Sequence, residues 1–365
     1  MDSEMAHPRG LTPEHEVTRD QTIPCETTRK RVYQRFKHKK DDSNVKFVPI
    51  NVEFNGSGSK TINKRARPPP KGLPRRPIST TGSRKKQVQR NAPWNLARIS
   101  HRRRHSTAYI YDERAGDGTC VYVLDSGIDL DHRDFEGRAS HSVSFWPDST
   151  SQSHGTRVAG IIGSIKYGVA KKTKLLSVQV LNDQGATTTS KLTAGLEYVL
   201  NNAQYRSKYC PKGTVVNISL TIPYSLAVDL AARKLVTRGY FVVVAAGNDG
   251  DEVSESPATE RLVCTVGSST RLDKIAWGSN HGLDINLFAP GQSIMSTRAG
   301  GGYQQASGTS MAAPHVAGVG ATLLAQGIRV VDLCNYITSI AVKNAIDLRG
   351  LEDETPNLLL SNGFT

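Results

Sequence analysis

The sequence predicts an α/β fold in which a parallel sheet is covered by helices on both faces. Short apolar runs that suit buried strands alternate with longer segments of helical periodicity. This alternation is typical of parallel sheets, because a crossover must return the chain to the same end of the sheet before the next strand begins. The predicted strands are residues 121–124, 175–181, 215–220 and 241–246, and the predicted helices are residues 154–165, 190–203, 225–238 and 309–326.

The last predicted helix begins inside an uncharged segment, residues 308–318, that reads GTSMAAPHVAG. Gly308 permits a tight turn, and the small residues after it allow the helix to pack closely against its neighbours. Ser310 stands at the start of this helix. Considered alone, a serine in that place is more ordinarily a helix N-cap. It is also where a nucleophile could stand, with its backbone N–H directed at a developing oxyanion.

Two further segments add an acid and a base to this serine. An apolar run ends at Asp125, and Gly127 makes the turn after it. Ligand and catalytic groups of parallel α/β folds collect at this edge of the sheet. His154 opens a second helix of small residues. Asp, His and Ser therefore follow one another in glycine-rich strand–turn–helix settings, and this chain order is that of subtilisin.

With these three motifs the chain resembles the subtilisin-like serine proteases, and most closely their proteinase K branch. The resemblance extends over about residues 87–362. It includes NAPWNLARIS from Asn91, YGVAKKTKL from Tyr167, VAAGN ending at Asn248 and SPATE from Ser256. The resemblance implies the three-layer subtilisin-like fold and a serine endopeptidase that hydrolyses peptide bonds.

The resemblance also implies a role for each residue of the site. Ser310 would attack the substrate carbonyl, His154 would take and return the proton, and Asp125 would hold the imidazole. Asn248 follows Gly247, where an asparagine is ordinarily a turn residue. The family match instead makes its side chain an oxyanion donor, beside the backbone N–H of Ser310.

In this family the substrate binds as an added β-strand between two edges of the enzyme. The third residue of the second edge is glycine in the family and Thr221 here. A β-branched residue adds bulk where the substrate backbone and its P1 side chain lie. Pro223 removes a backbone donor, and on the other edge Thr187 stands where the family often has glycine. We therefore expect a slower and narrower protease that accepts small P1 side chains best. The implied edges are Gly185-Ala186-Thr187 and Ser219-Leu220-Thr221.

The chain departs from the family at several positions. Arg157 replaces the second histidine of the family motif HGTH, and Ser151 and Ser153 replace glycines before it. Asn286 stands where the branch has an aspartate that binds calcium, and a neutral amide binds this hard cation less strongly than a carboxylate. We expect no required cofactor or metal, and at most weakened calcium binding. The departures leave one alternative open, a weakly active or inactive subtilase homologue that binds peptides.

Five cysteines bear on the cellular compartment. Four of them fall where the branch has two disulfides, and the resemblance implies the pairs Cys120–Cys210 and Cys264–Cys334. Cys25 is left over, and four buried free thiols are the alternative. Disulfides indicate an oxidising compartment. The residues after Met1 show no apolar stretch of a secretory signal. We give the cysteines more weight and expect a secreted, extracellular protein.

The sequence divides into three parts. Residues 1–59 form an N-terminal extension that could be a degenerate pro-region of a zymogen, residues 60–90 a basic proline-rich linker, and residues 91–362 the peptidase domain. Residues 60–104 contain fifteen Lys or Arg and no Asp or Glu, so they account for the net charge of +14.

The linker has three competing interpretations. It could be a solvated spacer, or a processing zone cut at the basic runs 64–65, 75–76 and 84–86. Nucleic-acid binding is disfavoured, because the linker has no aromatic residue for base stacking. We expect polypeptide substrates, a monomer, and no membrane span, since no stretch approaches about 20 apolar residues.

Overall fold

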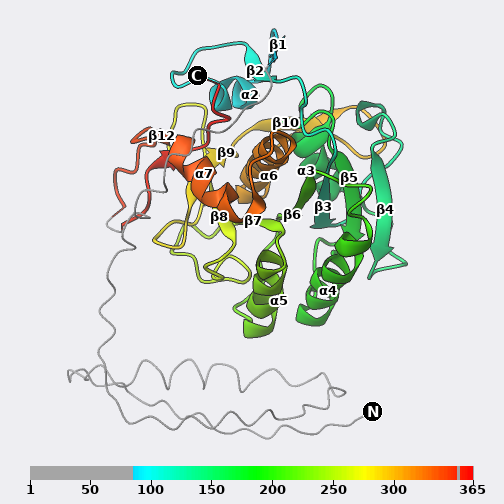
Figure 1. Ribbon diagram of the computed structural model, residues 1–365. Coiled ribbons are helices and arrows are strands. Elements are labelled where there is room, and N and C mark those ends of the chain that lie inside the picture. Colours follow the sequence, from blue (N-terminus) through cyan, green and yellow to red (C-terminus); the bar gives the residue numbers. More distant parts are fainter. Residues whose placement is uncertain (1–84, 352–353, 365) are drawn as a thin grey trace, which may run out of the picture. The chain divides into compact units, whose positions relative to one another are not determined.

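A large, mostly parallel sheet lies at the centre of the part of the chain that the computed structural model describes, residues 85–351 and 354–364 (Figure 1). The predicted extension, Cys25 and the linker up to residue 84 lie outside these residues. Neighbouring strands of the sheet are parallel except β12 and β13. The strand order is β12 (Val342–Lys343), β13 (Leu358–Leu359), β9 (Leu287–Pro290), β8 (Cys264–Ser269), β7 (Phe241–Ala245), β6 (Gly213–Ile218), β3 (Thr119–Asp125), β5 (Lys174–Gln179) and β4 (Ala139–Ser144).

Helices cover both faces of this sheet, as the sequence predicts (Figure 1). The reason is visible in β3, which is buried on both sides and whose side chains alternate between two cores. Val121 and Val123 join the core of α3 (Ser153–Gly163) and α6 (Thr309–Ala325). Tyr122 and Leu124 join the core of α4 (Thr189–Tyr205) and α5 (Leu226–Thr237) on the other face.

Shorter elements complete the described part of the chain. The helices α2 (Trp94–Ile99) and α7 (Leu333–Ile340) add apolar side chains to the core of α6. The short 3-10 turns are η2 (Arg133–Phe135) and η3 (Val330–Asp332). Two antiparallel pairs stand outside the main sheet: β1 (Lys86–Gln89) with β2 (Tyr109–Asp112), and β10 (Ile294–Thr297) with β11 (Tyr303–Ala306).

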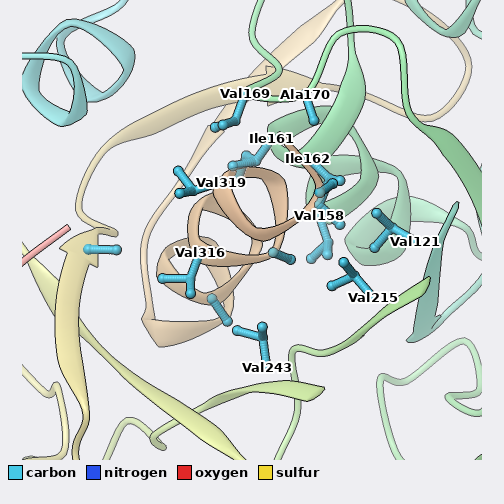
Figure 2. Packing of buried hydrophobic residues seen from close by; sticks show 14 of the residues in the cluster. Val121, Val158, Ile161, Ile162, Val169, Ala170, Val215, Val243, Val316 and Val319 are labelled. Atoms are coloured by element: carbon cyan, nitrogen blue, oxygen red, sulfur yellow. The ribbon is translucent and has the colours of Figure 1, made fainter. Parts of the chain in front are cut away.

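The helix α6 runs through the core with almost no surface in water. All of its residues are buried except Ser310, which is partly exposed. Figure 2 shows Val316 and Val319 of this helix among valines of the sheet and isoleucines of α3. Close approach requires small residues here: a Cβ added at Gly318 would stand 2.6 Å from Cβ of Val169. Of the whole helix, the packing thus leaves only its first turn accessible.

The predicted strands and helices are confirmed, with ends that shift by one or two residues. The predictions did not include α2, α7, β1, β2, β4 or the strands from β8 onward. Of these, β1 lies inside the predicted linker. Its side chains are mostly exposed, so it carries no apolar alternation that sequence reasoning could detect. Its backbone pairs with β2 in an antiparallel ladder from Lys86–Asp112 to Gln89–Tyr109. The folded domain therefore begins before residue 91.

The structure contains both implied disulfides. Cys120–Cys210 joins the start of β3 to the segment after α4, and Cys264–Cys334 joins β8 to α7, with Cα atoms 5.5 and 5.8 Å apart. The alternative of four free thiols is wrong. The crosslinks close loops of 90 and 70 residues, so each restricts the unfolded chain considerably.

We predict that full reduction lowers the melting temperature. Each disulfide of this kind contributes about 2–4 kcal/mol to the free energy of unfolding. Calorimetry with and without a reductant measures the effect. A double variant, Cys120→Ala with Cys210→Ala, should show part of the loss without reductant. An unchanged melting temperature under full reduction would contradict the prediction.

Candidate active site

The candidate residues gather at one edge of the sheet, where four neighbouring strands end. In the sheet, β7, β6, β3 and β5 lie side by side and parallel. Their carboxyl ends therefore meet at a common edge. Asn248 follows β7, residues 219–221 follow β6, Asp125 ends β3, and residues 185–187 follow β5.

Asp125 and His154 form a hydrogen-bonded pair at this edge. The Asp125 carboxylate is fully buried, whereas about 30% of the His154 side chain is exposed. Nδ1 of His154 lies 2.8 Å from Oδ1 and 3.0 Å from Oδ2 of Asp125. Oδ1 also accepts the backbone N–H of Ser126 at 2.7 Å. The carboxylate is thus fixed from two sides, and Nε2 is the ring nitrogen of His154 that is not bonded to Asp125.

The charge of Asp125 controls the protonation of His154. The negative carboxylate raises the pKa of the imidazole above its ordinary value of 6.5, against the opposing effects of burial and of the positive Arg157. Arg157 lies one helical turn after His154 in α3. One of its Nη atoms donates to Ser153 Oγ and to Gln304 Oε1, both at 3.2 Å. The departure from the family at this position therefore places a cation beside the base.

The side chains of Ser310 and Asn248 both lie close to Gly308. A Cβ built on Gly308 would lie 3.3 Å from both Ser310 Oγ and Asn248 Oδ1, and the φ of this glycine is +137°. A side chain at residue 308 would thus crowd both polar groups in a backbone conformation that disfavours it. The glycine keeps open the space between the serine hydroxyl and the asparagine amide.

Thr309 holds Asn248 in place, a role that the sequence reasoning missed. Its backbone N–H donates to Asn248 Oδ1 at 2.8 Å. Its hydroxyl accepts the N–H of Gly247 at 3.3 Å and lies 3.1 Å from Asn248 Oδ1. Since the amide oxygen is occupied, the Nδ2 group of Asn248 remains as the donor. The sequence feature that could have indicated this role is the position of Thr309 between Gly308 and Ser310.

The two predicted substrate edges differ in how they are anchored. On the first edge both backbone groups of Ala186 are bonded to Asn182. The N–H of Ala186 donates to Asn182 Oδ1 at 2.8 Å, and the N–H of Asn182 donates to the Ala186 carbonyl at 2.9 Å. Thr187 Oγ1 donates to the carbonyl of Val180 at 2.6 Å. On the other edge Ser219 is buried, whereas Leu220 and Thr221 are partly exposed.

Asn286 is already used inside the fold. Its Oδ1 accepts the backbone N–H of Thr265 at 2.7 Å, and its own N–H donates to the Thr265 carbonyl at 2.9 Å. The amide oxygen that would replace a carboxylate ligand is therefore engaged by β8, which is a poor fit to a calcium site. Within the described residues, no group of three or more His, Cys, Asp or Glu is arranged to hold a metal.

The family model of the subtilase family matches residues 116–345. This chain belongs to the subtilase family. The subtilase is 47% identical over 280 residues to the "Subtilisin-like serine protease AsES" of Sarocladium strictum, covering 76% of this chain and 71% of that protein. It is 45% identical over 280 residues to "Proteinase T" of Parengyodontium album, covering 76% and 94%.

A solved structure is also similar to this subtilase. The crystal structure of a cold adapted subtilisin-like serine proteinase superposes with a TM-score of 0.69 at 37% sequence identity, over 74% of this chain and 98% of that one. The relatives confirm the resemblance to the proteinase K branch and the fold, and the subtilase is a serine endopeptidase of that family. Among the described residues, no helix is long and apolar enough to cross a membrane.

We predict that the acid limb of the pH dependence of kcat/KM lies above the ordinary pKa of histidine in this subtilase. His154 is the expected base, and a base must be neutral to accept a proton, so we expect kcat/KM to fall as the pH drops through the pKa of His154. Because Asp125 raises that pKa, the acid limb should lie above 6.5. In the variant Arg157→Gln the limb should move further up, since the positive charge that lowers the pKa is gone.

The pH dependence of kcat/KM measures both effects. The variant Arg238→Gln is a matched control, because it removes one arginine at the end of α5 on the other face of the sheet. An acid limb that stays in place in Arg157→Gln, or that moves equally in the control, would refute the assigned influence of Arg157.

Proposed function

We propose that this subtilase cleaves polypeptides through the triad Asp125, His154 and Ser310. The observation that supports the proposal most directly is the pairing of buried Asp125 with His154, at the sheet edge where Thr309, the residue before Ser310, is bonded to Asn248. A serine hydroxyl is barely ionised at neutral pH and needs a base. His154 Nε2 takes the proton as Ser310 Oγ attacks the carbonyl carbon, and returns it to the leaving amine.

Asp125 acts through His154. Accepting from Nδ1–H, it selects the tautomer whose Nε2 lone pair is free, and it stabilises the imidazolium that forms. The negative charge of the tetrahedral intermediate goes to two donors, the backbone N–H of Ser310 and Nδ2 of Asn248. Thr309 pre-orients Asn248 for this role. Removal of such a donor costs about 10²–10³ in kcat, a range measured in a subtilisin.

The inactive-homologue alternative has less support. The substitutions near His154 remove no reacting atom, and Arg157 is tied to Ser153 and Gln304. Asp125 is bonded to Ser126 and His154, and Asn248 is bonded to Thr309. We therefore favour an active endopeptidase.

The substitution Ser310→Ala should reduce peptide hydrolysis to background without unfolding the protein, because it removes one oxygen from a partly exposed position. A fluorophosphonate probe should label the unchanged enzyme and not the variant. Ser307→Ala, in the strand-to-helix turn just before, is the matched control and should still be labelled. Hydrolysis by a clean preparation of Ser310→Ala would exclude the proposed triad.

We also propose that the protein is secreted and loses its N-terminal extension. The two disulfides suit an oxidising compartment. A relative named "Cuticle-degrading protease" from Metarhizium anisopliae is 45% identical over 280 residues. The basic run at residues 84–86 stands directly at the start of the paired strand β1.

The mature N-terminus is expected between residues 84 and 91, and the pairing of β1 and of the Lys85 carbonyl favours a start at or before Lys85. N-terminal sequencing of the purified active enzyme measures it. A substitution of Arg84-Lys85-Lys86 by glutamines should block or displace the cut. Residues before Lys60 still attached to an active enzyme would contradict this prediction.

A further inference from the structure

A carboxylate stands directly behind the second substrate edge. Thr221 Oγ1 donates to Glu255 Oε2 at 2.5 Å. The backbone holds the two segments together, because Ile222 and Ser256 exchange N–H···O bonds of 2.9 and 3.0 Å in an isolated antiparallel bridge. Glu255 is partly buried at this place. Thr221 is therefore more than added bulk, since its hydroxyl orients an acid.

The same carboxylate also approaches the oxyanion turn. A Cβ built on Gly247 would lie 3.1 Å from Glu255 Oε2. Gly247 precedes Asn248, and Asn248 is bonded to Thr309 beside Ser310. Glu255 thus lies between the second substrate edge and the turn that carries the oxyanion donor.

No cation of the described residues neutralises Glu255. None of their ion pairs includes it. Between residues 239 and 260 the chain has no Lys or Arg, while Asp249, Asp251 and Glu252 stand on the same loop. The region therefore has a negative potential, which favours the approach of positively charged ligands.

We propose that Glu255 makes this subtilase prefer substrates with Lys or Arg at P1. The inference rests on the proposed function. The P1 carbonyl carbon stands at Ser310 with its oxygen toward Asn248, and the P1 backbone follows residues 219–221. The P1 side chain then extends between Gly247 and Thr221, toward Glu255.

The preference follows from the cost of enclosing a charge. An apolar P1 side chain would displace water from the Glu255 carboxylate and would offer no hydrogen bond in place of those that the water made. A lysine ammonium or arginine guanidinium supplies a charge-assisted hydrogen bond instead, most strongly to the lone pairs that Thr221 leaves free. The expectation of small P1 residues rested on the bulk of Thr221 and Thr187, whereas the present proposal rests on the carboxylate of Glu255.

The test compares kcat/KM on peptides that differ only at P1. Arginine is compared with citrulline, which has nearly the same shape and no charge, and lysine is compared with norleucine. We expect each charged member to be preferred by about tenfold or more. In Glu255→Gln these ratios should collapse to within about threefold, since the shape of the residue is kept and its charge is lost.

Glu252→Gln is the matched control. It removes an equal charge from the same loop at an exposed position. The ratios should persist there, which separates contact with Glu255 from the general potential of the loop. Equal losses in both variants, a best substrate with alanine at P1, or citrulline equal to arginine would overturn the proposal.

A binding measurement keeps the proposal testable if hydrolysis fails. Calorimetry on Ser310→Ala, alone and combined with Glu255→Gln, compares product-like peptides that end in arginine or citrulline. The arginine peptide should bind more tightly only where Glu255 is present. If Ser310 is labelled, but kcat/KM does not differ between charged and uncharged P1 residues and the two peptides bind equally well, this inference alone is rejected. Absent labelling with retained arginine selectivity would reject the proposed function alone.

Discussion

The burial of α6 is the constraint on which the site depends. A helix surrounded by protein on all sides can approach its neighbours only through small residues, and Gly318 against Val169 shows how little room there is. Such a helix cannot shift or rotate without disturbing the packing of the sheet and of α3 (Figure 2). Its first turn is therefore held in one place, and Ser310 is on that turn.

The parallel sheet positions the other residues of the site. Four neighbouring strands end at one edge, so residues far apart in the chain become neighbours without any long loop to carry them. The polar groups at that edge also fix one another. Thr309 holds Asn248, Ser126 and His154 hold Asp125, and Thr221 holds Glu255. Each is oriented in advance by a hydrogen bond, which lowers the reorganisation needed when substrate binds.

The sequence predicts those parts of the molecule that local patterns encode. The apolar run before Asp125 predicts β3, and the small residues after Ser310 predict a buried helix. Asp, His and Ser in their chain order indicate the site, and the match to a known family assigns roles to each of them. The implied cysteine pairs are present in the structure.

Other parts depend on contacts that no local pattern contains. The strand β1 is mostly exposed and has a single apolar residue, and it forms because β2 pairs with it. The contact of Thr221 with Glu255 joins segments 34 residues apart and depends on the bridge between Ile222 and Ser256. The part played by Thr309 likewise requires Asn248 to be brought to it across the sheet.

The pairing of β1 has a consequence for self-digestion. A protease that takes its substrate as an added strand can cut only a segment whose backbone groups are free. Lys86 is in a ladder with Asp112, and the carbonyl of Lys85 accepts the N–H of Glu113 at 2.9 Å. Peptide bonds after these lysines are thus protected, because the backbone groups around them are already paired. An enzyme that favours basic P1 residues would in this way trim its own chain up to a limit set by its fold.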